Sequence, residues 1–118
     1  MNMVPETIRV VKDKKTLVVQ FKNGPEYKLS AELLRVESPS AEVQGHSPSQ
    51  KKIICGRKHV GIIGVEPVGN YAIRLIFDDL HDSGIFSWSY LHELGRDQER
   101  LWKNYLEALE NEGLSRDP

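Results

Sequence analysis

The sequence contains a single cysteine, Cys55, among its 118 residues. One thiol cannot form an internal disulfide, and a zinc finger needs several cysteine and histidine ligands. No apolar stretch approaches the ~20 residues of a membrane-spanning helix, and no apolar run near the start resembles a signal peptide. We therefore expect a soluble, cytoplasmic protein that does not bind membranes.

An excess of charge of either sign is also missing. Sixteen Lys and Arg balance 17 Asp and Glu, which gives a formal net charge of -1 and no overall field to attract nucleic acid. A local basic cluster consists of Lys51, Lys52, Arg57 and Lys58, but basic residues beside a loop are usually just solvated. We expect no nucleic-acid binding.

What is present is the composition of one ordinary globular domain. Hydrophobic residues make up 39% of the chain and charged residues 28%, and a chain of this length buries a core without disulfides or metals. Residues 1–118 are therefore predicted to form a single domain. Residues 1–5 and 114–118 are predicted to be flexible ends.

The first part of the chain has the period-two alternation of strands. Residues 7–12, 16–22 and 26–29 alternate apolar with polar side chains and are separated by turn residues, which predicts an antiparallel meander. Ser30 then caps a short helix that ends near Pro39.

Residues 60–68 and 71–77 are expected to pair as a hairpin around Gly69-Asn70, a dipeptide suited to a two-residue turn. That register places Val68 opposite Tyr71, Ile62 opposite Phe77 and Gly64 opposite Leu75. Because both hairpin faces carry apolar residues, we expect both to be covered.

The rest of the chain is predicted to be mainly helical. Residues 85–87 favour a short extended piece, and residues 88–94 a helical turn that ends at Gly95. Asp97 then caps a last helix with a wide apolar stripe, which Gly113 ends. The predicted fold class is α+β: a β-meander and hairpin sheet, a short middle helix and a C-terminal helix packed on it.

Residues 38–50 (SPSAEVQGHSPSQ) have Val43 as their only sizeable apolar side chain, so we expect a loop. A loop of this length is uncommon in a compact domain and is usually functional or mobile.

The richest polar cluster follows the apolar strand 71–77 and contains Asp78, Asp79, His81 and Asp82. Three carboxylates around an imidazole can hold a divalent metal or raise the histidine pKa. The alternative is a turn in which the aspartates bond their own backbone. The sequence alone favours the turn.

Enzyme signatures are absent from the pattern. No histidine has an acid two residues later, the spacing common in iron oxygenases, and no phosphate-binding loop ending occurs. Cys55 and His59 lie four residues apart without an acid to orient the histidine. We find no nucleophile, base and orienting acid that form a set.

Two segments resemble a known family: residues 34–46 (LRVESPSAEVQGH) and residues 79–91 (DLHDSGIFSWSYL). The family is the domain at the N-terminus of gamma-butyrobetaine hydroxylases, also called DUF971, which also occurs alone in small bacterial proteins. The resemblance covers about residues 5–109. The chain departs from the family at Leu80, where glycine is usual, and at Phe86, where tyrosine is common.

The resemblance implies that this domain binds zinc in the hydroxylases, where a Cys-x-Cys-x-x-Cys segment and a distant histidine supply the ligands. The corresponding positions here are Ser38, Ser40, Val43 and His81. Three of the four ligands are replaced, and neutral serines are poor substitutes for thiolates, so we expect no structural zinc.

The resemblance also implies a non-catalytic role, because the separate iron- and 2-oxoglutarate-dependent domain of the hydroxylases is missing. Members fused to iron–sulfur ATPases imply a link to iron or iron–sulfur metabolism. We therefore expect an accessory domain that binds a protein partner. Its candidate contact residues are Asp79, His81, Asp82, Trp88, Ser38 and His46. The alternative is an iron-binding protein that uses His81 with Asp79 or Asp82, and an enzyme is the third hypothesis.

Overall fold

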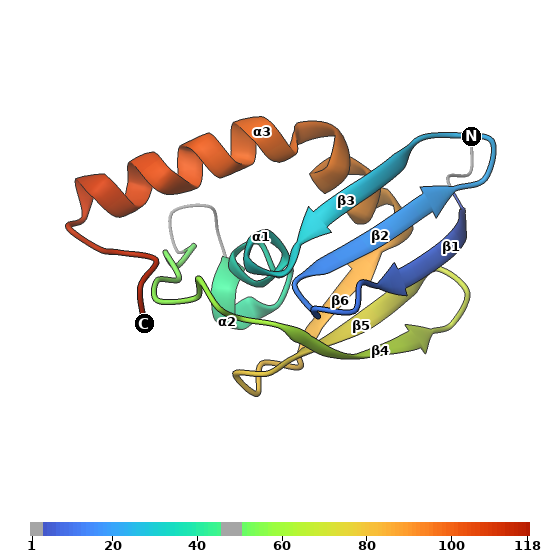
Figure 1. Cartoon of the computed structure of the whole chain (residues 1–118), viewed down its shortest axis with the longest axis horizontal. Coiled ribbons are helices and arrows are strands. Elements are labelled where there is room, and N and C mark those ends of the chain that lie inside the picture. The colour runs from blue at the N-terminus through green and yellow to red at the C-terminus, as the bar shows by residue number, and fades with distance from the viewer. Residues whose placement is uncertain (1–3, 46–50) are drawn as a thin grey trace.

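A computed structural model of the chain describes residues 4–45 and 51–118 (Figure 1). The first sheet has the order β1-β2-β3 and consists of β1 (Pro5–Val10), β2 (Thr16–Phe21) and β3 (Glu26–Ser30). All neighbours are antiparallel, so the predicted meander is confirmed. Leu17, Val19 and Phe21 of the central strand are fully buried, as their alternation predicts.

The short helix α1 (Ala31–Val36) follows β3 directly. The Ser30 hydroxyl accepts a hydrogen bond from the Leu33 backbone N–H at 3.0 Å, which is the predicted cap. All six residues of α1 are buried, including Glu32 and Arg35. Charged side chains buried in this way need partners, and both find them in segments distant in sequence.

The second sheet has the order β4-β5-β6, with β4 (Ile62–Val68), β5 (Ala72–Phe77) and β6 (Gly84–Ser87). The hairpin and the short strand near residue 85 are confirmed. Ile62 faces Phe77 as predicted, but Val68 pairs with Ala72 and Gly64 with Ile76. The turn is one residue longer than expected, and a register shift between Ile62 and Gly64 absorbs the difference.

Only one face of this second sheet is covered, which corrects the expectation of burial on both sides. Ile73, Leu75 and Phe77 enter the core between the sheets and the helices. On β4, Ile63 is 53% exposed, and Ile85 of β6 is also exposed. Apolar residues on both faces of these strands therefore did not predict two covered faces, because no element among residues 4–45 and 51–118 covers Ile63 and Ile85.

The helix α3 (Trp88–Asn111) is continuous, whereas the sequence predicts a break at Gly95. Ser87 caps it by accepting a hydrogen bond from the Tyr90 N–H. A Cβ on Gly95 would lie 2.2 Å from the Tyr27 ring, so the glycine allows α3 to pack closely on β3. Gly95 thus serves the packing of a helix and does not end one. Figure 1 shows α3 lying along one side of the molecule, above α1 and the sheets.

Residues 38–45 differ from the predicted loop. They contain the one-turn helix α2 (Ala41–Gln44), and Ser38, Ser40 and Val43 are buried. A polar segment can be buried where its polar groups find partners, and Ser38 and Ser40 have theirs on a distant loop. Residues 46–50 lie outside the described part of the chain.

Residues 114–118, predicted to be a flexible end, form backbone hydrogen bonds with the middle of the chain. The backbone oxygens of Ser115 and Arg116 accept from the N–H groups of Gly56 and Lys58, at 2.9 and 3.0 Å. Of the opposite end, residues 1–3 are outside the described residues, and Pro5 belongs to β1. Among the described helices, none combines the length and the apolar character needed to cross a membrane.

Candidate functional site

The turn between β5 and β6 presents the polar cluster singled out in the sequence. Its backbone is tightly bonded: the Phe77 N–H donates to the His81 oxygen at 3.0 Å and the Leu80 N–H to the Phe77 oxygen at 3.1 Å. The Asp78 N–H donates to the oxygen of Gly61, directly before β4, at 2.9 Å. The turn interpretation of this cluster is therefore correct, and the turn is held rigidly on its sheet.

Asp79 fixes the turn to two distant arginines. Its Oδ2 accepts from Arg35 Nε and Arg57 Nε, both at 2.7 Å, and its Oδ1 accepts from the His81 N–H at 3.2 Å. Burial raises the pKa of Asp79, but the hydrogen bonds from Arg35 and His81 outweigh it and hold the pKa below the usual value. Asp79 is thus a charged anchor already engaged on both oxygens.

His81 points into the protein and is only 6% exposed. Its Nε2 lies 2.9 Å from Ser38 Oγ and 3.4 Å from Ser40 Oγ, and its Nδ1 lies 3.1 Å from Glu42 Oε2. A carboxylate only accepts, so in the neutral ring Nδ1 carries the proton and Nε2 accepts from a serine hydroxyl. Burial, together with the Arg35 charge, lowers the pKa of His81, which favours this neutral form.

Glu42 is the member of this cluster that the sequence did not identify. It lies in α2, and its placement beside His81 depends on the turn of helix that was not predicted. The side chains of Ser38, His81 and Glu42 are joined in the order serine, histidine, acid, as in a catalytic triad. The sequence did not reveal this arrangement. Ser38 is 0% exposed, so its hydroxyl is closed to substrates in this conformation. We assign these bonds a structural role: they hold α2 against the β5–β6 turn.

The residues present do not fit the zinc ion of the related hydroxylases. Ser38 and Ser40 do meet His81, as the resemblance implies, but they offer hydroxyls in place of thiolates. Val43 has no ligand atom, and the 2.9 Å contact between Ser38 and His81 leaves no room for a metal between them. Within residues 4–45 and 51–118, no group of three or more His, Cys, Asp or Glu is arranged to hold a metal ion.

The remaining candidate residues are dispersed. Asp82 is exposed and lies 3.5 Å from Arg74 on β5, away from the buried His81 ring. Trp88 is half-buried, and its Nε1 donates to the Asn70 oxygen at 2.8 Å, so its ring lies between core and surface. His46 lies outside the described residues. Three of the four basic residues near residue 55 face a carboxylate: Lys51, Arg57 and Lys58.

Leu80, at the tip of the turn, was not on the list of candidates. It is 84% exposed, and its φ of 71° lies in the left-handed region that side-chain-bearing residues rarely adopt. The one signal in the sequence was the departure from glycine at this position in the family. The structure gives that departure a physical meaning, because glycine takes this conformation without strain.

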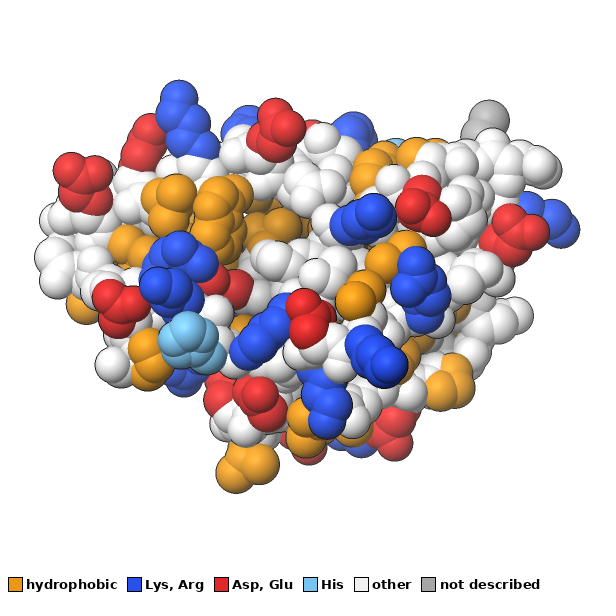
Figure 2. All heavy atoms as spheres, viewed as in Figure 1, with side chains coloured by type: hydrophobic (Ala, Val, Ile, Leu, Met, Phe, Trp, Pro, Cys, Tyr) orange, Lys and Arg blue, Asp and Glu red, His pale blue; other side chains and the backbone are white. Residues whose placement is uncertain are grey.

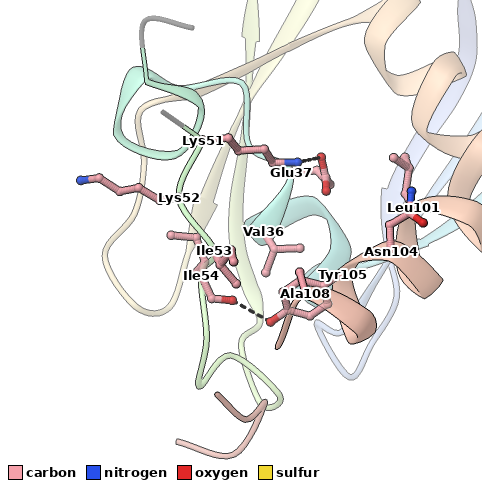
Figure 3. A pocket seen from close by; sticks show the side chains of 10 residues that line it. All are labelled: Val36, Glu37, Lys51, Lys52, Ile53, Ile54, Leu101, Asn104, Tyr105 and Ala108. Atoms are coloured by element: carbon pink, nitrogen blue, oxygen red, sulfur yellow. Dashed lines mark hydrogen bonds and ion pairs between the residues drawn. The ribbon is translucent and has the colours of Figure 1, made fainter. Parts of the chain in front are cut away.

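A second feature missed in the sequence is a cavity of about 240 Å³ between α1, α3 and residues 51–54. Figure 2 shows a hollow of hydrophobic side chains below α3 with basic groups beside it. In Figure 3, Val36, Ile54 and Tyr105 approach one another, while the Lys52 side chain points away. Lys51 is bonded to Glu37, and the Tyr105 hydroxyl donates to the Ile54 oxygen at 2.6 Å. These polar groups are already paired, so the cavity has little left to orient a polar ligand.

Comparison with known proteins identifies the family of the chain. The model of the family described as gamma-butyrobetaine hydroxylase-like, N-terminal, matches residues 8–92. The chain belongs to the gamma-butyrobetaine hydroxylase-like N-terminal family. The resemblance stated from two motifs is thereby confirmed, and both the β5–β6 turn and residues 38–45 lie within the matched region. No curated protein matches the chain.

Solved structures of this family have the same fold. Two NMR solution structures are 49% and 42% identical to the chain, with TM-scores of 0.84 and 0.85; they cover 98% and 99% of it, and 91% and 87% of their own chains. A crystal structure of a DUF971 protein of unknown function from Acidithiobacillus ferrooxidans is 37% identical, with a TM-score of 0.64, covering 77% of this chain and 91% of that one.

Proposed function

We propose that this gamma-butyrobetaine hydroxylase-like N-terminal domain is a non-catalytic protein-interaction module whose contact surface is the β5–β6 turn. The observation that carries the proposal is Leu80, a large apolar side chain that is 84% exposed in a left-handed backbone conformation. That conformation costs about 1–2 kcal/mol for a residue with a Cβ. A strained, exposed leucine gains nothing in the isolated domain, but it gains by burial in a partner.

The turn is also suited to binding because it is already ordered. Asp79 is held by Arg35 and Arg57, and the backbone on both sides of Leu80 is hydrogen-bonded. A rigid binding element loses little conformational entropy on association. His81 and Ser38, expected to touch the partner, are buried; in this proposal they position the turn from behind.

The charges around Leu80 indicate the chemistry of the partner. Asp78, Asp82 and Glu42 are exposed acids on or beside the turn. The two arginines beside the turn are already paired, Arg57 with Asp79 and Arg74 with Asp82. An apolar socket bordered by lysine or arginine matches this surface, and opposite charges at its rim would accelerate association.

A comparison of two exposed leucines tests the proposal. Leu80→Asp and Leu106→Asp each place a charge on an exposed site, and Leu106 lies on α3, far from the turn (Figure 1). After crosslinking in cells, we expect Leu80→Asp to reduce the recovery of wild-type partners by about tenfold or more. Leu106→Asp should recover them at the wild-type level. Equal recovery by both variants, with the fold intact by circular dichroism, contradicts the proposal.

The metal alternative has less support from the geometry. Both Asp79 oxygens are engaged, and Asp82 is directed to Arg74, so neither carboxylate is free to share an iron ion with His81. An iron(II) titration followed at the His81 ring signals distinguishes the two functions, because only metal binding produces a saturable shift there. The link of the partner to iron or iron–sulfur metabolism rests on the family resemblance.

A further inference from the structure

Residues 114–118 lie in the structure as a bound peptide would. After α3, Gly113 turns the chain with a φ of 66°, and the Leu114 N–H donates to the Leu109 oxygen. The oxygens of Ser115 and Arg116 then accept from the N–H groups of Gly56 and Lys58. Two backbone bonds to residues 56–58 therefore hold the segment on both sides of the bend at Arg116.

The side chain of Arg116 enters a site made by other elements. Its Nη2 lies 2.8 Å from Glu32 Oε1 and its Nε 2.9 Å from Glu32 Oε2, the two-pronged geometry of a guanidinium on a carboxylate. The guanidinium carbon lies 5.1 Å from the centre of the Trp102 ring, within the range of a cation–π contact.

The burial of Glu32 distinguishes its contact with Arg116 from an ordinary surface ion pair. Glu32 is 6% exposed, whereas Arg116 is 37% exposed, so the carboxylate belongs to the protein interior and the arginine arrives from outside. Arg116 is the only cation paired with Glu32 within the described residues. Arg116 covers the Glu32 carboxylate in this structure, so a segment that leaves this place removes the paired cation, and a second cationic side chain restores the pair.

We propose that Glu32, Trp102 and the backbone of residues 56–58 form a binding site for an arginine-bearing peptide, which residues 114–118 of the chain itself occupy. A partner's peptide of the same chemistry takes the place of this segment. Arginine fits better than lysine, because its planar fork matches both carboxylate oxygens and its flat face stacks on the indole. The site is separate from the β5–β6 turn and does not depend on the function proposed for it.

Residues 114–118 compete with an external peptide for the site. A tethered segment has an effective concentration of about the millimolar range, so it excludes weak external peptides. The segment joins α3 through Gly113, and glycine changes its backbone conformation at little steric cost, so release of the segment does not require α3 to move. The chain's own segment therefore acts as a competitor that a tighter peptide must displace.

The test uses full-length Arg116→Ala and a synthetic peptide with the sequence of residues 114–118, LSRDP. Binding is followed by the NMR signal of the Trp102 indole. We expect saturable binding to Arg116→Ala that is at least about tenfold tighter than to the wild type, whose own segment competes. A peptide with alanine in place of arginine should bind about tenfold more weakly or worse. No binding to folded Arg116→Ala, or equal binding of the two peptides, overturns the proposal.

Two further variants keep the test decisive. Asp117→Ala is the matched control, because it removes an exposed carboxylate that lies 3.6 Å from Lys58 and leaves the Glu32 contact in place; it should bind the peptide as weakly as the wild type does. If Arg116→Ala does not fold, Arg116→Lys replaces it in the test, because lysine keeps the positive charge but cannot bond both oxygens of Glu32 as the guanidinium does. Free arginine should then raise the melting temperature of Arg116→Lys more than that of the wild type, and an equal effect on both counts against the site.

Discussion

Leu80 and His81 are neighbours at the tip of one turn, yet they face opposite environments. The Leu80 side chain is exposed on a strained backbone, whereas His81 is buried against serines from the start of α2. Of these two side chains, only that of His81 helps to hold the turn on the domain, together with the Asp79 carboxylate. Leu80 is therefore part of the exposed surface, whereas His81 contributes to the stability of the domain.

Replacement of Leu80 by glycine should make the isolated domain more stable. Relief of the left-handed strain contributes about 1–2 kcal/mol, and the greater entropy of glycine in the unfolded chain removes about 0.5–1 kcal/mol. We expect a net gain of up to about 1.5 kcal/mol in urea unfolding. Leu80→Ala is the control, because it removes the same side chain and keeps the strain. A glycine variant no more stable than the alanine variant would show that the conformation is not strained.

His81 should make stability depend on pH near neutrality. Its pKa is lowered below 6.5 by burial and by Arg35, so the unfolded chain binds a proton at a higher pH than the folded one. Stability is therefore complete above about pH 6.5 and falls as the pH drops toward the folded pKa, by at most about 1.4 kcal/mol per pH unit. Thermal unfolding between about pH 8 and pH 5 measures this loss.

The matched control for this pH dependence is the exposed His59. His81→Gln should flatten the stability profile between neutral and mildly acidic pH, whereas His59→Gln should leave it as in the wild type. A profile unchanged by His81→Gln would assign the acid sensitivity to another group.

At the scale of elements, α3 shows how packing overrides a local signal. Gly95 weakens a helix locally and Asp97 favours a new start, so two helices are the sound prediction from sequence. The Tyr27 ring of β3 occupies the space beside Gly95 and fixes the helix there. Burial of the apolar stripe of α3, with Leu91, Leu94, Tyr105 and Leu109, outweighs the local cost of one glycine.

Gly95→Ala should therefore destabilise the domain, although alanine favours helices. The added Cβ meets the Tyr27 ring, and overpacking costs about 1–3 kcal/mol, more than the gain in helix propensity of about 1 kcal/mol. The double variant with Tyr27→Ala should recover part of this loss, since the clash is gone. A double-mutant cycle by chemical denaturation gives the coupling, and additive effects would mean that the two residues do not clash.

At the scale of the whole molecule, segments far apart in sequence converge on the β5–β6 turn. Residues 114–118 bond Gly56 and Lys58, and the Arg57 between these two reaches Asp79 with its side chain. Arg35 of α1 meets the same carboxylate. The C-terminal segment, the middle of the chain and the turn are thus linked through one arginine.

This linkage predicts a remote effect of Arg116→Ala on the turn. Release of residues 114–118 should loosen Arg57, and the Leu80 and His81 amides should exchange hydrogen about tenfold faster. Amides of β2, such as Val19, report global stability and correct for any overall loss. Asp117→Ala should leave the exchange at the turn unchanged. If Arg116→Ala accelerates exchange at Gly56 and Lys58 but not at the turn, Arg57 does not transmit the change.

The sequence by itself determined the parts of this protein that depend on neighbouring residues. Alternation specified the meander and the hairpin, Ser30 specified the start of α1, and two motifs identified the family. The two motifs also identified His81, Ser38 and Ser40 as one group. Such features are readable because strand alternation and helix caps act over a few residues.

Only the tertiary structure decided what those groups do. Ser38 and His81 are 43 residues apart, and Arg116 and Glu32 are 84 apart, so no local pattern relates their side chains. The continuity of α3 at Gly95 depends on a ring from β3, and the exposure of Leu80 depends on how its turn is bonded. Long-range packing and the pairing of buried charges set these outcomes, and neither is a property of a short stretch of sequence.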